Sequence, residues 1–171
     1  MRTVAVIGAG QMGSGITQTV AQFGMKVLLS DVDIALAEKA KANIEKAFTR
    51  LVSREKLTPD EAIAALARIT PVADYAPMVE ADLIIEAATE KEEIKHRIFA
   101  AAGKVLGPDA IMASNTSSIP ITRMAVSSPD PARFIGLHFF NPVPVMGLIE
   151  VIPGLATAKD TVARTRAFAE G

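Results

Sequence analysis

The 171-residue sequence contains no cysteine. This absence excludes disulfide bonds, thiolate nucleophiles and cysteine-bound zinc, and no metal site is predicted. Long apolar runs are also missing, since none approaches the roughly 20 residues needed to cross a bilayer. No secretory leader precedes the first apolar run, which favours a cytoplasmic location.

An excess of charge of either sign is lacking as well. The sequence has 18 Lys and Arg against 19 Asp and Glu, and its isoelectric point is about 6.1. Because the basic residues are scattered and form no stripe, neither nucleic acid nor an anionic membrane is an expected partner. Half of the residues are apolar, which at this length suffices for one full core. We therefore expect a single domain over residues 1–171.

The most informative stretch is the amino-terminal one. An apolar run at 4–7 enters the sequence GAGQMG at 8–13, and a second apolar run at 27–29 ends in Ser30 and Asp31. This order of strand, glycine-rich turn, helix, strand and acid is typical of a dinucleotide-binding unit. The alternative is that the glycines serve only the turn and the packing.

Each glycine of that motif has a physical purpose. Gly8 makes the turn, Gly10 lets a pyrophosphate approach the backbone, and Gly13 lets the helix lie close to the strand. The pyrophosphate would meet the free N–H groups at the helix start, where the dipole is positive. Asp31 would accept hydrogen bonds from the adenosine ribose and repel a 2′-phosphate, so the sequence predicts NAD as the cofactor.

The remainder of the chain alternates between helical and strand patterns. Helices are expected at 34–51, 62–68, 91–104, 119–126 and 158–170, and strands at 69–72, 83–87, 110–113, 134–138 and 148–152. Such alternation predicts an α/β fold with a doubly wound, mostly parallel sheet that binds ligands at the carboxyl ends of its strands. That edge would gather Gly10, Asp31, Glu90, Asn115, Ser117 and His138.

Three motifs resemble one known family. GAGQMG, ASNTSS at 113–118 and GLHFFNPVPVMGLIEV at 136–151 are similar to the L-3-hydroxyacyl-CoA dehydrogenases, which include 3-hydroxybutyryl-CoA dehydrogenases, over essentially the whole chain. The resemblance implies a Rossmann-type NAD-binding domain. It also implies a mostly helical second domain beyond residue 171, which is absent from this chain, supplies a further active-site asparagine and makes a homodimer.

The resemblance also assigns roles to residues. His138 would be the catalytic base, Glu150 its carboxylate partner, and Ser117 the contact to the reacting oxygen of the substrate. The cofactor would be held by Gly8, Gly10, Gln11, Met12, Gly13, Asp31, Glu90, Lys95 and Asn115. Besides Ser117, the acyl-CoA side would involve Asn141 in a loop-shaping role, and Arg54 and Lys56 near the CoA phosphates.

The chemistry of these residue types agrees with the roles. Oxidation of a secondary alcohol needs a group that takes the hydroxyl proton, and histidine titrates in the required range. Glu150 falls within an apolar strand, where an unpaired carboxylate is costly, so a partner is expected. Plainer alternatives stay open: a satisfied histidine at a strand end, a serine-rich segment at 114–118 that caps the next helix, and a solvated face for Arg54 and Lys56.

Three functions compete at this stage. The first is NAD-dependent oxidation of an L-3-hydroxyacyl-CoA to a 3-ketoacyl-CoA. The second is a related 3-hydroxy acid dehydrogenase that does not use CoA, and the third is a non-catalytic NAD-binding module. The combination of His138, Glu150 and Ser117 argues against the third.

Overall fold

A seven-stranded sheet forms the centre of the computed structural model, which describes residues 1–171. The strand order is β3-β2-β1-β4-β5-β6-β7, and all neighbouring pairs are parallel except β6 and β7. The strands are β1 (Thr3–Ile7), β2 (Lys26–Ser30), β3 (Ile69–Pro71), β4 (Leu83–Glu86), β5 (Ile111–Ser114), β6 (Phe134–Phe139) and β7 (Ile149–Pro153).

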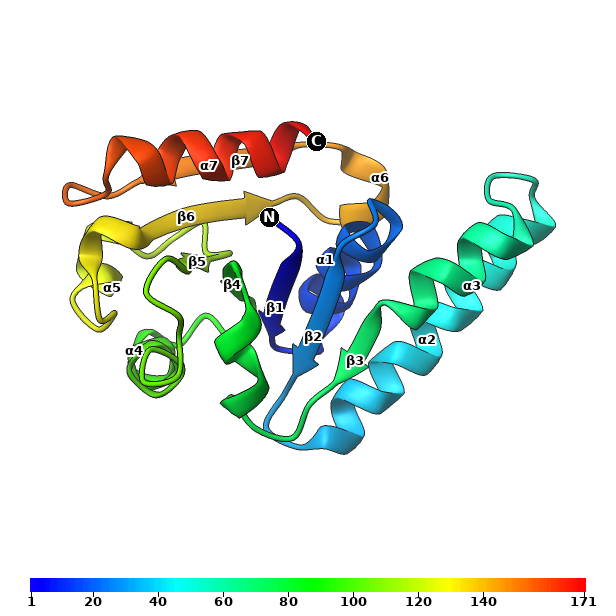
Figure 1. Cartoon of the computed structure of the whole chain (residues 1–171), viewed down its shortest axis with the longest axis horizontal. Coiled ribbons are helices and arrows are strands. Elements are labelled where there is room, and N and C mark those ends of the chain that lie inside the picture. Colours follow the sequence, from blue (N-terminus) through cyan, green and yellow to red (C-terminus); the bar gives the residue numbers. More distant parts are fainter.

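Helices cover both faces of this sheet. The α-helices are α1 (Gln11–Gln22), α2 (Ile34–Ser53), α3 (Pro59–Ala67), α4 (Glu92–Ala102), α5 (Ile121–Ala125), α6 (Val143–Met146) and α7 (Lys159–Glu170), and short 3₁₀ helices span Ala76–Glu80 and Pro131–Arg133. Figure 1 shows α4 and α5 on one side of the molecule, with the α2–α3 hairpin projecting on the other. None of these helices combines the length and the apolar character needed to cross a membrane.

Alternating side chains on the strands build two cores. Val4, Val6 and Ile85 pack with α1 and α2, whereas Ala5 and Ile84 face α4 and α5. Every residue of β4 is buried, because the helices leave neither face of this strand to solvent. The α/β, doubly wound, mostly parallel sheet predicted from the sequence is confirmed, and each of the seven strands begins and ends within one residue of the prediction.

Local sequence explains how α3 begins. The Thr58 hydroxyl accepts the N–H of Glu61, and the Glu61 carboxylate accepts the N–H of Thr58, which completes a capping box in front of Pro59. These hydrogen bonds lower the pKa of the Glu61 carboxyl from its usual value. The capping box fixes the residue at which α3 begins.

Three short helices are absent from the sequence-based prediction. The segment after β6 contains the short helix α6, which packs on α1 where Gly15 leaves room for Val143. The 3₁₀ helices at Ala76–Glu80 and Pro131–Arg133 are the other two. All three are too short for a 3.6-residue period to appear in the sequence, and each contains proline near its first residue.

Candidate active site

The glycine turn between β1 and α1 has the geometry of a phosphate cradle. Gly8 has a φ of +107°, and a Cβ there would lie 2.6 Å from the carbonyl oxygen of Ala87. A Cβ on Gly13 would overlap the carbonyl oxygen of Gly8, so the helix needs glycine to approach the turn. A Cβ on Gly10 would meet no atom within 4 Å, which leaves open space above the turn.

The start of α1 is free of protein caps. Gly10 is the N-cap residue, no side chain bonds to the helix end, and the first turn holds no acid. The N–H groups that begin with Gln11 and Met12 therefore remain available to an anion. Beside them lies a cleft of about 460 Å³, bounded by α1, by Asn43 and Ile44 of α2, and by the segment from Asn141 to Pro144. These features fit a bound dinucleotide.

The predicted ribose acid lies directly against this turn. Asp31 follows β2, and its carboxylate accepts the N–H of Ala9 at 2.6 Å and its neighbour Val32's N–H at 2.7 Å. The same carboxylate also affects the single tyrosine of the chain. Burial raises the pKa of the Tyr75 hydroxyl, and the negative charges of Glu86 and Asp31 raise it further. The site is therefore electronegative where an adenosine ribose would present its hydroxyl donors.

His138 and Glu150 form the predicted pair. They face each other in the antiparallel register of β6 and β7, with His138 Nδ1 2.8 Å from Glu150 Oε2. The side chain of His138 is 18% exposed and that of Glu150 is 52% exposed. Burial was thus the wrong reason to expect a partner, because β7 is an edge strand. With Nδ1 engaged, Nε2 is the nitrogen left for a substrate.

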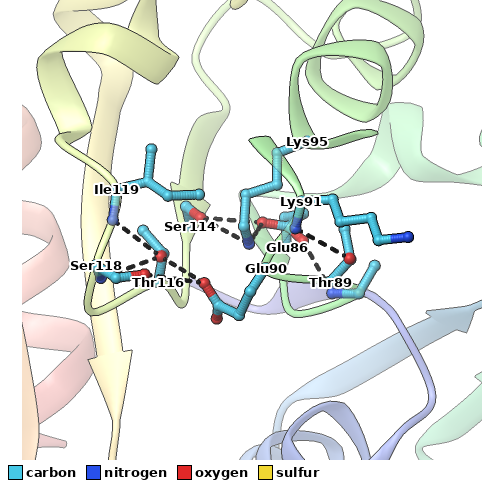
Figure 2. Close-up of polar contacts among 10 residues, drawn as sticks. Glu86, Thr89, Glu90, Lys91, Lys95, Ser114, Thr116, Ser118 and Ile119 are labelled. Atoms are coloured by element: carbon cyan, nitrogen blue, oxygen red, sulfur yellow. Dashed lines mark hydrogen bonds and ion pairs between the residues drawn. The ribbon is translucent and has the colours of Figure 1, made fainter. Parts of the chain in front are cut away.

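The ASNTSS segment joins neighbouring loops through its side chains. The Asn115 carboxamide oxygen accepts the N–H of Phe139 at 2.8 Å, which ties the end of β5 to the strand that carries His138. The Thr116 hydroxyl donates to Glu90 at 2.9 Å, and the Ser118 hydroxyl donates to the same oxygen at 3.4 Å (Figure 2). Glu90 therefore holds the β5–α5 loop in place.

Ser117 is left exposed and makes no side-chain hydrogen bond within the chain. The alternative that this segment caps the following helix does not apply, because Pro120 is the N-cap of α5 and no side chain caps that helix. The Thr116 oxygen instead accepts the N–H groups of Ser118 and Ile119 within the loop. The Ser117 hydroxyl is accordingly available to a ligand.

Lys95 is placed differently from the other predicted cofactor residues. Its side chain is 1% exposed, and its ammonium group lies 2.6 Å from Glu86 Oε2 and 3.5 Å from Ser114 Oγ. It points from α4 into the protein, away from solvent, as Figure 2 shows. The structure therefore does not present Lys95 at the surface of the cleft.

Arg54 and Lys56 lie at the tip of the α2–α3 hairpin, far from β6 and β7 (Figure 1). Both are exposed and form no ion pair. Lys56 lines a shallow groove of about 470 Å³ together with Glu55 and Glu61, so the groove carries both signs of charge. The fold alone does not join this tip to His138; a ligand that reached both would have to be extended.

Sequence reasoning missed Glu86, Ser114 and Thr116. Glu86 ends an apolar strand buried on both faces, and an acid in such a place needs a partner. That feature could have identified it, whereas its partners Lys95 and Ser114 lie on separate elements and no local pattern connects them.

Comparison with known proteins agrees with this geometry. The family model described as the 3-hydroxyacyl-CoA dehydrogenase NAD-binding domain matches residues 3–171. A 3-hydroxybutyryl-CoA dehydrogenase of Bradyrhizobium diazoefficiens is 44% identical over 98% of this chain and 57% of its own length. A 3-hydroxyadipyl-CoA dehydrogenase of Escherichia coli is also 44% identical, over 95% of this chain and 34% of its own length.

Solved structures give the same result. The (S)-3-hydroxybutyryl-CoA dehydrogenase of Ralstonia eutropha superimposes with a TM-score of 0.97 at 43% identity, covering 99% of this chain and 60% of that one. This chain therefore spans about 60% of the length of that relative. The matched model, the glycine turn and the acid after β2 agree on NAD as the cofactor. The chain belongs to the 3-hydroxyacyl-CoA dehydrogenase family, as an NAD-binding domain of that family.

Proposed function

We propose that this domain serves the oxidation of an L-3-hydroxyacyl-CoA to the 3-ketoacyl-CoA, with NAD as the hydride acceptor. The observation that carries the proposal is the hydrogen bond between His138 and Glu150 at the carboxyl edge of the sheet that also bears the glycine turn. A histidine with one ring nitrogen engaged and the other free is the arrangement that a general base needs.

His138 takes the proton in this mechanism. The hydroxyl proton of the substrate would pass to Nε2 while a hydride leaves the carbon that bears this hydroxyl. The double bond of the ketone then forms between that carbon and the hydroxyl oxygen. Glu150 keeps the Nδ1 proton on the ring and stabilises the imidazolium that results. NAD, when bound, supplies the carbon that accepts the hydride.

Two polar groups of the β5–α5 loop would steady the substrate and the cofactor. The free Ser117 hydroxyl can bond to the reacting oxygen as its charge changes during the transfer. The Asn115 oxygen is already committed to Phe139, so only its NH₂ group can meet a ligand, and the ligand atom must be an acceptor. A ribose hydroxyl oxygen or a carboxamide oxygen of the cofactor satisfies that condition.

The CoA part of the substrate would run towards the α2–α3 hairpin. The cleft of about 460 Å³ lies between Asn141 and the middle of α2, and Arg54 and Lys56 lie at the far end of that helix. Two cations there would attract phosphate groups. A dehydrogenase of free 3-hydroxy acids would have no use for these two residues, which is why we favour the CoA ester.

The test compares two substrates on two proteins. One protein is the 171-residue chain, and the other, called the extended protein below, is this chain continued by the helical second domain that the family resemblance implies. We expect both to bind NAD, and only the extended protein to reduce NAD rapidly with 3-hydroxybutyryl-CoA, because water exclusion and hydride alignment need both walls of the cleft.

Each outcome has a definite meaning. Equal turnover of free 3-hydroxybutyrate and its CoA ester would favour the dehydrogenase that does not use CoA. NAD binding without turnover of either substrate by the extended protein would favour a non-catalytic module. Comparable turnover by the short chain would show that His138, Ser117 and Glu150 suffice alone. We also propose that the homodimer contact is made by the helical second domain that the family resemblance implies.

A further inference from the structure

A buried ion pair lies beneath the carboxyl edge of the sheet. Glu86, the last residue of β4, is 0% exposed, and Lys95 of α4 is 1% exposed. Their charged atoms are 2.6 Å apart, and the hydroxyl of Ser114, also 0% exposed, donates to the same Glu86 oxygen at 2.9 Å. Figure 2 shows the three side chains converging from three elements. We call this group the Glu86 triad.

The triad is an expensive way to fill a core. Two charges lose their hydration when they are buried, and apolar residues of similar size often serve stability equally well. What the triad provides is a fixed orientation of the groups that it joins, because each of its hydrogen bonds requires a particular geometry. Glu86 uses both oxygens, one for Lys95 and Ser114 and the other for the N–H of Ala88 at 2.9 Å.

Three ligand-facing segments meet at the triad. Ala88 contacts the glycine turn, since a Cβ on Gly8 would lie 2.6 Å from the Ala88 Cα. Ser114 is followed by Asn115, whose own N–H donates to the Glu86 carbonyl at 2.9 Å. Lys95 fixes the first turns of α4 behind the loop that carries Glu90. The β4–α4 loop and the β5–α5 loop are thereby bonded to Glu86, and the glycine turn packs against the first of these loops.

The bond between Glu90 and Thr116 depends on the same spacing. It joins the two loops at their outer ends, while the triad joins them at their base, as Figure 2 shows. A shift of either loop by an ångström would break the outer bond and move the Ser117 hydroxyl and the Asn115 NH₂ group relative to the glycine turn.

We propose that the Glu86 triad positions the site: Glu86, Lys95 and Ser114 hold the two loops and the glycine turn in the alignment that NAD binding and hydride transfer require. Lys95 acts on the loops through Glu86 and Ser114. The part that concerns hydride transfer rests on the proposed function, whereas the part that concerns NAD binding does not.

The decisive variant neutralises the pair without leaving a lone charge. In the extended protein, the double variant Glu86→Gln with Lys95→Met should melt close to the wild-type temperature, because no unpaired buried charge is created. We expect its kcat to fall about 10²-fold, since misplacement by an ångström costs that much, while the KM for 3-hydroxybutyryl-CoA stays nearly constant. Its affinity for NAD should fall as well, measured by calorimetry.

A milder variant and a matched control complete the experiment. Ser114→Ala keeps both charges and removes one bond, so a smaller loss in kcat and in NAD affinity is expected even if the double variant does not fold. The control is Glu80→Gln with Lys26→Met, which neutralises an ion pair of 2.8 Å between exposed side chains. It should change neither quantity.

Wild-type kcat and NAD affinity in the folded double variant, or in Ser114→Ala if the double variant is unfolded, would overturn the proposal. So would variants that lose stability but, once folded at low temperature, bind NAD and turn over normally, because the triad would then only support the core. If the wild-type extended protein turns over no 3-hydroxyacyl-CoA, the proposed function fails, and the NAD affinities still decide the role of the triad.

Discussion

The carboxamide oxygen of Asn115 accepts the backbone N–H of Phe139 at 2.8 Å. The backbone ladder between β5 and β6 ends at Ser114 and Gly136, so this side chain continues the pairing after the two strands have separated. It holds the end of β6 and with it His138. The β5–α5 loop and the end of β6 that carries His138 are therefore bonded to each other.

Asn115→Ala in the extended protein should reduce both stability and turnover. The N–H of Phe139, a residue that is 2% exposed, would lose its partner, which costs about 1–3 kcal/mol. The matched control is Thr157→Ala, which removes a side-chain bond to the carbonyl of Phe134 at the opposite end of β6. Urea unfolding should show a loss for both variants, and NADH absorbance should show a turnover loss for Asn115→Ala alone.

His138→Gln in the extended protein should lower turnover about 10²- to 10⁴-fold, the range for loss of a general base, and leave NAD affinity nearly unchanged. Glu150→Gln should act in the same direction, because the ring then loses the carboxylate that orients it. The control is His96→Gln, since His96 bonds to Ser127 and Glu92 outside the site. Ordinary turnover of an L-3-hydroxyacyl-CoA by His138→Gln would remove it from the role of base.

Much of this arrangement was predictable because it depends on local sequence. Glycines at 8, 10 and 13 are required by backbone approach within one turn, and residues 83–85 of β4 are apolar because both faces of this strand are covered. These features need no knowledge of distant contacts. The pairing of His138 with Glu150 was implied by the family resemblance, and the antiparallel register of β6 and β7 brings the two residues together.

The buried network was beyond prediction for the opposite reason. Lys95 reads as one of several charges on an amphipathic helix, and only the packing of α4 on β4 and β5 turns it inward to Glu86 and Ser114. For Glu150 the apolar strand pattern predicted a buried side chain, but the side chain is 52% exposed. The reason is that a strand at the edge of a sheet keeps one side in water.

Asp31 should set the preference for NAD over NADP. Asp31→Ala is expected to weaken NAD binding and to reduce the difference in affinity between NAD and NADP, because the carboxylate that repels a 2′-phosphate is gone. Asp33→Ala is the neighbouring control: its carboxylate caps α2 by accepting the N–H of Ala35, so the variant should lose about 1 kcal/mol of stability and keep the preference. Titration of NADH and NADPH by their fluorescence measures both. A preference for NADP that Asp31→Ala does not change would contradict the assignment.

Asp82 should make stability depend on pH in the acid range. Burial alone would raise the pKa of its carboxyl, but hydrogen bonds from the N–H groups of Arg2 and Thr3, with the charges of the amino terminus and Arg2, hold that pKa below its usual value. A lowered pKa stabilises the fold above the unfolded value, and this contribution is lost as the pH falls through the folded value.

Asp82→Asn should therefore be less stable at pH 7 by about 1 kcal/mol, a figure reduced for the solvent that reaches the carboxylate. The difference from wild type should vanish as the pH falls through the lowered pKa of the folded Asp82 carboxyl. Asp109→Asn, whose side chain makes no hydrogen bond or ion pair, serves as the control and should follow the wild-type curve. Thermal melts at a series of pH values measure all three proteins, and parallel wild-type and Asp82→Asn curves would contradict the prediction.

Gly10 and Gly13 should separate cofactor binding from folding. Gly10 has a φ of −71° and open space around its missing Cβ, so Gly10→Ala should change stability by no more than about 1 kcal/mol. Its methyl group would occupy the space where the pyrophosphate approaches the backbone, and NAD affinity should fall at least about tenfold, or 1.4 kcal/mol.

Gly13→Ala should affect folding stability first, whereas Gly10→Ala affects NAD affinity first. Its Cβ would overlap the Gly8 carbonyl oxygen, a backbone atom that cannot rotate away, so α1 must shift and stability should fall by about 1–3 kcal/mol. Gly107→Ala, whose Cβ would lie 3.5 Å from the nearest atom, should change neither property. Urea unfolding and NADH titration of the three variants suffice. If Gly10→Ala binds NAD as tightly as the wild type, the pyrophosphate does not cross this turn, because no protein atom competes for that space.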